Sequence, residues 1–422
     1  MTVALIIFIA MYIGMLAFSR QRVWFALGGA ACMLAFGVLP VSALFGAIDW
    51  NVIMMIAGTM GIVTLFIETG MPARLADMML QSVKNACWAV VMLSVFAGVV
   101  SAFVDNVATV LMVAPVGMEI CKKLKINPVP VIIAIAVSSN LQGAATLVGD
   151  TTSILLGGYA GMSFVDFIWW RGRPSIFWAV ELGALGTAFI LRWLFRKEKA
   201  PVTSERMTEV TDYFPGYLMI AVVVFLIFAS FFKIPYVDGI KNGLICLALC
   251  VIGLVRGCIR KRSMGDLKLV AKEMDWATLG MLAGLFVVIA GIRAAGIIDA
   301  IADWFASVGG DVFGLYSLIV FASVIISAFV DNIPYVAAML PVVQGIALRL
   351  GIDPVVLYFG LLSGATLGGN ITPFGASANV AGIGILRKEG YEVKNSDFFR
   401  IGVPFTLTAV VIGYLFIWVF WS

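Results

Sequence analysis

The sequence predicts an all-α integral membrane protein made of two inverted-topology repeats, each with five membrane crossings, one hairpin and a helix broken at mid-membrane. Hydrophobic residues make up 62% of the chain and charged residues 12%, and the mean hydropathy is +1.05. This leaves too little polar surface for a soluble globule of this size. The apolar runs are roughly 15 to 25 residues long and lack the period-2 alternation of a barrel strand, so the crossings are helices.

A six-residue motif that occurs twice reveals the repeats. Ser-Ala-Phe-Val-Asp-Asn occurs at 101–106 and again at 327–332, which is 226 positions later. Other pairs keep this spacing without insertion: Asp49 and Asp275, Pro115 and Pro341, Thr146 and Thr372, Gly149 and Gly375. A register held over about a hundred residues indicates a duplicated unit.

The apolar runs give both repeats the same plan. The first repeat, 1–195, has expected crossings at 2–19, 23–43, 51–67 and 176–195, a hairpin at 87–121 and a broken helix at 128–159. A polar stretch at 196–213 is expected to be a cytoplasmic linker. The second repeat, 214–422, has expected crossings at 215–232, 243–254, 275–292 and 402–421, a hairpin at 312–348 and a broken helix at 354–386. Five crossings is an odd number whether the hairpins are re-entrant or fully spanning, so the second repeat is inverted.

The distribution of positive charge predicts the orientation. With both termini outside the cell, the cytoplasmic loops hold 22 of the 28 Lys and Arg residues and the outer loops hold 6. This asymmetry is typical of a multi-pass protein of the cell inner membrane. The first apolar run lacks a basic leader and a cleavage site, so we expect a retained span. The formal charge of +4 is spread through loops, which argues against a nucleic-acid partner.

Two Asp-Asn pairs are the strongest candidates for a coupling site. Each pair interrupts an apolar run, where a carboxylate costs about 2.5 to 3.5 kcal/mol and therefore needs compensation from water, an ion or a partner. Two pairs in inverted repeats suggest one shared ion site, formed by Asp105, Asn106, Asp331 and Asn332. Capping of the second hairpin helix is the alternative, and it is compatible with ion binding.

The broken helices supply a second set of polar residues. Glycines with hydroxyls and carboxamides at membrane depth are tolerated where the backbone lines a cavity. Close packing through small residues is the alternative. Asp150 is equivalent in position to Ala376 of the other repeat, so the two half-sites are unequal. We expect Asp150 to belong to the coupling site. The expected substrate cavity consists of Thr109, Asn140, Thr146, Gly149, Thr151, Thr152, Ser153, Asn370, Thr372, Ser377 and Asn379.

Catalysis has no support in the sequence. The chain has no histidine, and its six cysteines are scattered through apolar segments without a CxxC pair. It contains no phosphate-binding loop, no metal cluster and no nucleophile-base pair. We therefore expect no enzyme activity and no cofactor, with Na⁺ or H⁺ as the only coupling ion and no metal other than Na⁺ at the coupling site.

Three segments resemble the ion transporter superfamily. They are SAFVDNVATVLMVAP from 101, SNLQGAATLVGDTTS from 139 and GATLGGNITPFGASANV from 364. The nearest branch contains the arsenite permeases, the P protein and NhaD-type antiporters, and the citrate and divalent anion:sodium symporters are more distant. The chain departs from that branch at Gly149-Asp150-Thr151-Thr152-Ser153, where Gly-Asp-Pro-Pro-Asn is usual. It departs from the carboxylate symporters at the hairpin tips, which carry Asp-Asn in place of Ser-Asn-Thr.

The resemblance implies a secondary transporter with a scaffold and a moving domain of the elevator type. The first hypothesis is exchange of a small inorganic ion or oxyacid, arsenite or Na⁺, for H⁺. The second is sodium-coupled symport of citrate, a dicarboxylate or another anion, and the third is a passive anion channel. Expected partners are the small substrate and the lipid bilayer, with a homodimer implied by some relatives.

Overall fold

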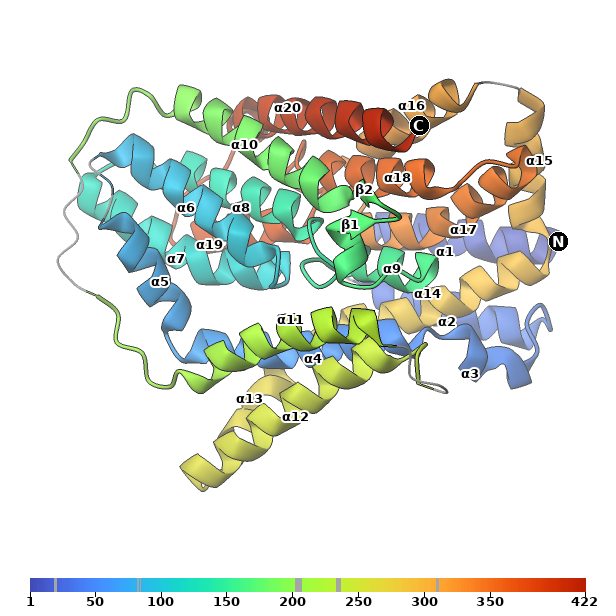
Figure 1. Ribbon diagram of the computed structural model, residues 1–422, viewed down its shortest axis with the longest axis horizontal. Helices are drawn as coiled ribbons and strands as arrows, with labels where there is room; N and C mark the ends of the chain where they lie inside the picture. The colour runs from blue at the N-terminus through green and yellow to red at the C-terminus, as the bar shows by residue number, and fades with distance from the viewer. Residues whose placement is uncertain (19–20, 82, 84, 202–206, 233–236, 309–310) are drawn as a thin grey trace.

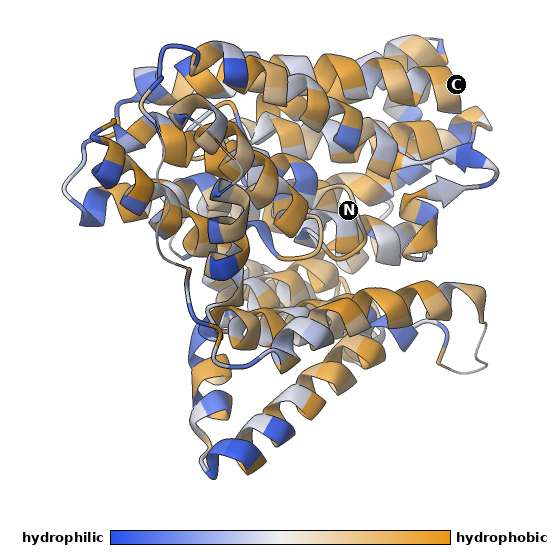
Figure 2. Cartoon of the chain, turned by 60° about the vertical axis from the view of Figure 1, so that its left-hand side comes forward, coloured by the Kyte–Doolittle hydropathy of each residue, from blue (hydrophilic) through white to orange (hydrophobic). Residues whose placement is uncertain are grey.

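The structure is a computed structural model, and apart from one short strand pair its regular elements are helices, as predicted. It describes residues 1–18, 21–81, 83, 85–201, 207–232, 237–308 and 311–422, which include helices α1 to α20. Within those ranges seven helices of 18 residues or more are apolar enough to cross a membrane, and shorter apolar helices accompany them. Figure 2 shows hydrophobic residues along the helices and hydrophilic ones mainly at their ends and in the turns. The chain is therefore a multi-pass membrane protein.

The helices of the first half have the following bounds: α1 Thr2–Ala17, α2 Arg22–Ala35, α3 Leu44–Ala47, α4 Trp50–Glu68, α5 Met71–Leu80, α6 Ala86–Ser101, α7 Asn106–Leu124, α8 Pro128–Gly143, α9 Thr151–Ala160 and α10 Ile176–Leu194. Short 3-10 turns lie at Val41–Ala43 and Val165–Phe167. Strands β1, Trp169–Trp170, and β2, Arg173–Pro174, form a small antiparallel hairpin before α10.

The helices of the second half are α11 Phe214–Phe231, α12 Lys241–Lys261, α13 Gly265–Glu273, α14 Trp276–Ala294, α15 Ile297–Val308, α16 Val312–Ser327, α17 Asn332–Leu350, α18 Val355–Gly368, α19 Ser377–Lys388 and α20 Asn395–Trp421. The bounds of α4, α6 and α7 recur 226 positions later in α14, α16 and α17. The two halves thus fold into the same series of helices.

The helices form two layers, which are separated on the left and in the middle of Figure 1 and approach each other at the right. We call α1–α4 and α11–α14 the lower body, and α5–α10 with α15–α20 the upper body. In the lower body, α2 packs on α14 and α12 packs on α4, so each repeat packs on the other. Glycines allow this close approach, because a Cβ at Gly58 would lie 2.4 Å from the carbonyl carbon of Cys246. The equivalent Gly284 lies against the backbone of Ala26 in the same way.

The upper body holds the hairpins and the broken helices. The hairpin of α6 and α7 lies toward the left of Figure 1, and that of α16 and α17 lies toward the right. Each broken helix crosses between repeats, since α9 packs on α17 and α19 packs on α7 and α8. The inner ends of both hairpins are therefore held near the second halves of both broken helices.

Three short helices and one early helix end differ from the sequence-based plan. The expected crossing at 23–43 is helical only to Ala35, because Gly37 takes a positive φ and Pro40 follows. Helices α5, α13 and α15 were not expected, since their apolar residues follow helical periodicity without forming a long apolar run. Residues 202–206 of the expected linker lie outside the described residues.

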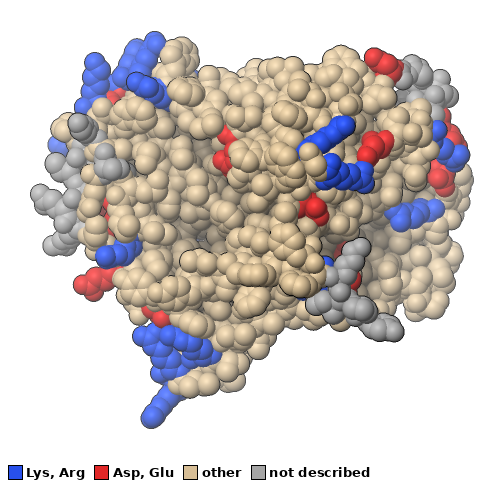
Figure 3. Space-filling model, viewed as in Figure 1, with Lys and Arg blue, Asp and Glu red and all other residues tan. Residues whose placement is uncertain are grey.

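Basic residues are concentrated at one end of the face seen in Figure 3. Lys and Arg gather at the left-hand end and at the lower tip formed by α12 and α13, and fewer lie at the right. The orientation of the chain is inferred from this unequal distribution of Lys and Arg. Which side of the membrane each end faces stays a prediction.

Candidate ion and substrate site

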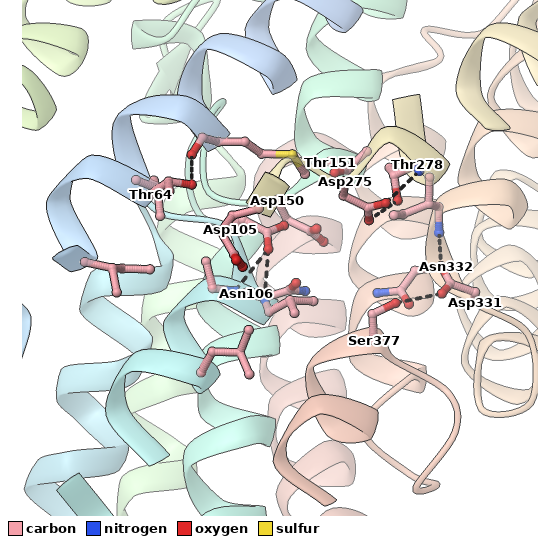
Figure 4. A pocket seen from close by; sticks show the side chains of 18 of the residues that line it. Thr64, Asp105, Asn106, Asp150, Thr151, Asp275, Thr278, Asp331, Asn332 and Ser377 are labelled. Carbon is pink, nitrogen blue, oxygen red and sulfur yellow. Dashed lines mark hydrogen bonds between the residues drawn. The ribbon is translucent and has the colours of Figure 1, made fainter. Parts of the chain in front are cut away.

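A cavity of about 410 Å³ lies between the two bodies. Helices α4, α13 and α14 of the lower body form one wall, and α7, α9, α17 and α19 of the upper body form the opposite wall. In Figure 4, Thr64 and Thr278 of the first wall lie above Asn106 and Ser377 of the second. Its polar lining consists of Thr64, Glu68, Asp105, Asn106, Asp150, Thr151, Glu273, Asp275, Thr278, Asp331, Asn332 and Ser377. The two hairpin tips, which are far apart in sequence, therefore face the same cavity.

The two hairpin aspartates both cap helices at this cavity. Asp105 Oδ1 accepts hydrogen bonds from the amides of Val107 at 3.0 Å and Ala108 at 3.2 Å at the start of α7. Asp331 Oδ1 accepts from the amide of Ile333 at 3.1 Å at the start of α17. Capping uses one oxygen of each carboxylate, which leaves the other oxygen for a further partner.

Asp150 adds a carboxylate from the break between α8 and α9. It is 3% exposed, and its Oδ2 accepts a hydrogen bond from the Thr152 hydroxyl at 2.7 Å. Ala376 occupies the equivalent position before α19, next to Ser377 on the cavity wall. The inequality of the two half-sites that the sequence indicates is thus present in the cavity itself.

Three asparagines connect the first hairpin tip to both broken helices. Asn106 donates to Asn140 Oδ1 at 2.9 Å, and Asn140 donates in turn to Asn370 Oδ1 at 3.0 Å and to the carbonyl of Thr366 at 2.8 Å. Asn106 faces the cavity, whereas Asn140 and Asn370 are fully buried behind it. The network links the two repeats in the centre of the upper body.

Repeated threonines and glycines hold the breaks against the hairpin tips. The Thr146 hydroxyl donates to the carbonyl of Ala102, and the equivalent Thr372 hydroxyl donates to that of Ala328. A Cβ on Gly149 would lie 2.6 Å from the carbonyl oxygens of Gly143 and Ser101. Gly375, which is its equivalent, is enclosed by backbone in the same way. These positions fix the backbone that presents the acidic residues.

The structure places seven of the sixteen predicted site residues on the cavity wall. They are Asp105, Asn106, Asp150, Thr151, Asp331, Asn332 and Ser377. The other nine lie behind the wall: Thr109, Asn140, Thr146, Gly149, Thr152, Ser153, Asn370, Thr372 and Asn379. Several of these brace the breaks, as Asn379 does by donating to the carbonyls of Gly369 and Thr372.

Sequence reasoning missed the residues that the lower body contributes. Glu68, Glu273 and Asp275 line the cavity, and the side chain of Asp275 also caps α14 through the amide and hydroxyl of Thr278, at 2.9 and 2.5 Å. The repeat register included Asp275 but gave it no role. Arg22, one of the 22 basic residues that the predicted orientation assigns to cytoplasmic loops, donates to Asp331 Oδ2 at 2.5 Å.

The lining is strongly acidic. It includes six carboxylic residues and, among the lining side chains of the described chain, no lysine or arginine. Clustered carboxylates in a hollow with low-dielectric walls raise the local concentration of cations. Arg22 neutralises Asp331, whereas Asp105 and Asp150 on the upper-body wall have no ion pair among the described residues.

Paired hairpins and broken helices around a polar cavity between two helical bodies define a membrane transporter. The sequence agrees, because the citrate transporter family matches residues 3–361. The chain belongs to that family, which confirms the resemblance to the ion transporter superfamily. Transport, and not catalysis, is the activity for which this family is named.

Individual relatives match over most of this chain, and some of them are named as transporters. An uncharacterized transporter of Mycobacterium tuberculosis is 30% identical over 432 residues, covering 99% of this chain and 97% of its own length. The human P protein is 27% identical over 475 residues, covering 92% of this chain and 56% of its own length.

Two solved structures share the fold. The YdaH transporter of Alcanivorax borkumensis matches with a TM-score of 0.64 at 14% identity, over 89% of this chain and 87% of that one. Neisseria gonorrhoeae MtrF, described as illuminating a class of antimetabolite efflux pumps, matches with a TM-score of 0.57 at 15% identity, over 87% and 80%. At such identities the likeness concerns the fold alone.

Proposed function

We propose that this chain is a secondary active transporter that works by alternating access. The observation that carries the proposal is a second cavity, also of about 410 Å³, between the two bodies. Its lining repeats that of the acidic cavity 226 positions away. The equivalent pairs are Met60 and Phe286, Val63 and Ile289, Thr64 and Ala290, Ile67 and Arg293, Glu68 and Ala294, Leu111 and Ala337, and Asp275 and Asp49.

The two cavities lie toward opposite ends of the same pair of helices. The acidic cavity uses the end of α4 and the start of α14, whereas the second cavity uses the start of α4 and the end of α14. A site reached from one side through the first cavity and from the other side through the second is what alternating access requires. In the predicted orientation, the acidic cavity is the cytoplasmic one.

One hydrogen bond joins the two bodies at the second cavity. Arg293 of α14 donates to the Tyr159 hydroxyl of α9 at 2.5 Å, and within the upper body that hydroxyl donates to Gln344 of α17 at 2.6 Å. Movement of the upper body along the lower one would break the bond from Arg293 and open this side. We therefore propose an elevator-type motion, with the upper body as the transport domain.

Asp105, Asp150 and Asp331 are the proposed coupling site for a cation or proton. An acidic lining favours a small inorganic cation such as Na⁺, or an uncharged oxyacid such as arsenite, exchanged for H⁺. The second candidate is symport of citrate or another carboxylate with sodium, which is favoured by the family's description. In that case a bound cation would have to separate the substrate from the carboxylates.

Flux into proteoliposomes tests the proposal. Purified protein is reconstituted, and uptake of Na⁺, arsenite and citrate is measured under an imposed pH gradient and, separately, under an imposed sodium gradient. Exchange predicts uptake driven by the pH gradient without sodium, and symport predicts uptake that requires sodium. Conductance without accumulation against a gradient would indicate a passive channel and would contradict secondary active transport.

A further inference from the structure

The two hairpin aspartates differ in the cation that faces them. Asp331 Oδ2 accepts from the Arg22 guanidinium at 2.5 Å and from the Ser377 hydroxyl at 3.0 Å. Asp105 has hydrogen-bond donors only from the backbone amides of α7, as far as the described chain shows. The repeat therefore carries equivalent carboxylates, of which one is paired with an internal cation.

The ion pair joins the two bodies. Arg22 begins α2, which packs on α1 and α14 in the lower body, whereas Asp331 lies at the hairpin tip of the upper body. The side chain of Arg22 is 26% exposed and that of Asp331 is 17% exposed, so both remain near water. A pair whose partners belong to different bodies depends on the relative position of those bodies.

We propose that Arg22 competes with the coupling cation for Asp331, and that it displaces the cation from this hairpin tip in the conformation seen here. The proposal rests on the coupled transport proposed above. When the upper body moves away from Arg22, Asp331 loses its partner and binds a cation or proton from the other side. When the body returns, the guanidinium takes the carboxylate again and the cation leaves through the acidic cavity.

The surroundings of Asp331 favour this exchange. Once Arg22 is withdrawn, a carboxylate among other acidic groups has no internal compensation and needs a cation or proton. The titratable and charged groups that share cavities with Asp331 are Tyr12 of α1, Arg22 of α2, Glu68 of α4, Asp105 of α7, Asp150 before α9, Glu273 of α13 and Asp275 before α14. Arg22 is the only cation among these groups, so this one residue decides whether Asp331 has an internal positive partner.

Three variants separate competition from a structural role. In Arg22→Gln the Asp331 carboxylate is free to bind the cation, so we expect the apparent cation affinity to be at least about tenfold tighter. The attraction between two opposite unit charges in contact at a protein surface exceeds the free energy of a tenfold change in affinity. Arg22→Lys keeps the positive charge and should stay close to the wild type. Arg22→Gln combined with Asp331→Asn removes both charges and should abolish the gain.

The readout is binding and flux with Na⁺ and protons as probes. Affinity is measured by thermal stabilisation of the purified full chain as Na⁺ or pH is titrated, and net uptake and cation-for-cation exchange are measured in proteoliposomes. Arg22→Gln should slow net uptake while exchange persists, since release is impaired but binding is not. Unchanged or weaker cation affinity in folded Arg22→Gln, or equal affinity in the single and double variants, would overturn the competition.

The controls also distinguish this inference from the proposed function. If Arg22→Gln does not fold, the double variant and Arg22→Lys still test the inference. Competition requires that tight cation binding depend on Asp331 and that a positive charge at position 22 suppress it. Both variants are expected to bind the cation about as the wild type does, so double-variant affinity about tenfold tighter than that of Arg22→Lys would contradict the inference, because tight binding would then not need Asp331. If no cation affects the wild type in either assay, the coupled transport itself is wrong.

Discussion

Asp105→Asn separates the two roles that this side chain can have at the hairpin tip. The amide oxygen of asparagine accepts the same two backbone hydrogen bonds as Asp105 Oδ1, at 3.0 and 3.2 Å. Asn and Asp are about equally good N-caps, and the lost charge at the helix start contributes about 0.3 to 1 kcal/mol. We therefore expect stability to fall by no more than ~1 kcal/mol, while the charge available to a cation disappears.

The effect on coupling is larger. A carboxylate about 4 Å from a monovalent cation contributes ~4 kcal/mol at an effective dielectric constant of about 20, before desolvation is subtracted. We expect the apparent affinity for the coupling cation to fall roughly 10- to 1,000-fold. Asp311→Asn is the matched control, because Asp311 caps α16 through the amide of Gly314 at 2.9 Å and is not among the residues lining the acidic cavity.

The assay pairs thermal unfolding of the purified protein with cation-dependent uptake in proteoliposomes. Asp105→Ala should lose the cap as well as the charge, and so should be about 1 kcal/mol less stable than Asp105→Asn. Wild-type cation dependence in Asp105→Asn would refute the ion-binding role and leave capping as the function of this carboxylate. Loss of affinity in Asp311→Asn would show that the effect is not specific to the cavity.

Three further predictions concern the framework around the cavity. Gly149→Ala places a methyl group 2.6 Å from two carbonyl oxygens and should destabilise the protein by about 1 to 3 kcal/mol in thermal unfolding, whereas Gly384→Ala, with no atom within 4 Å, should be neutral or stabilising. Asn140→Leu leaves buried amides without partners and should reduce the free energy of unfolding by at least ~2 kcal/mol, and an unchanged value would contradict the network. Arg293→Gln weakens the closure of the second cavity, so a cysteine at Ala290 in a cysteine-free background should be labelled about tenfold faster, and unchanged labelling would argue against this gate.

The polar residues of the broken helices show where sequence reasoning reaches its limit. Glycine, threonine and asparagine at membrane depth identify a break, because they cannot continue an apolar helix comfortably. Once the helix breaks, its periodicity no longer indicates which side chains point outward. Thr151 therefore faces the cavity while its neighbour Thr152 is buried behind it, and the sequence treats the two alike.

The sequence by itself determined the fold class, the duplication and the position of both hairpin aspartates, since these depend on local composition and on a register of 226 residues. Only the tertiary structure decided which charges meet. Arg22 lies 309 positions from Asp331. Glu68 and Asp275 reach the cavity from expected crossings to which the sequence assigned no site role, and Glu273 reaches it from a helix that was not expected. Contacts across two packed bodies depend on how whole helices lie against each other, and no local pattern records that arrangement.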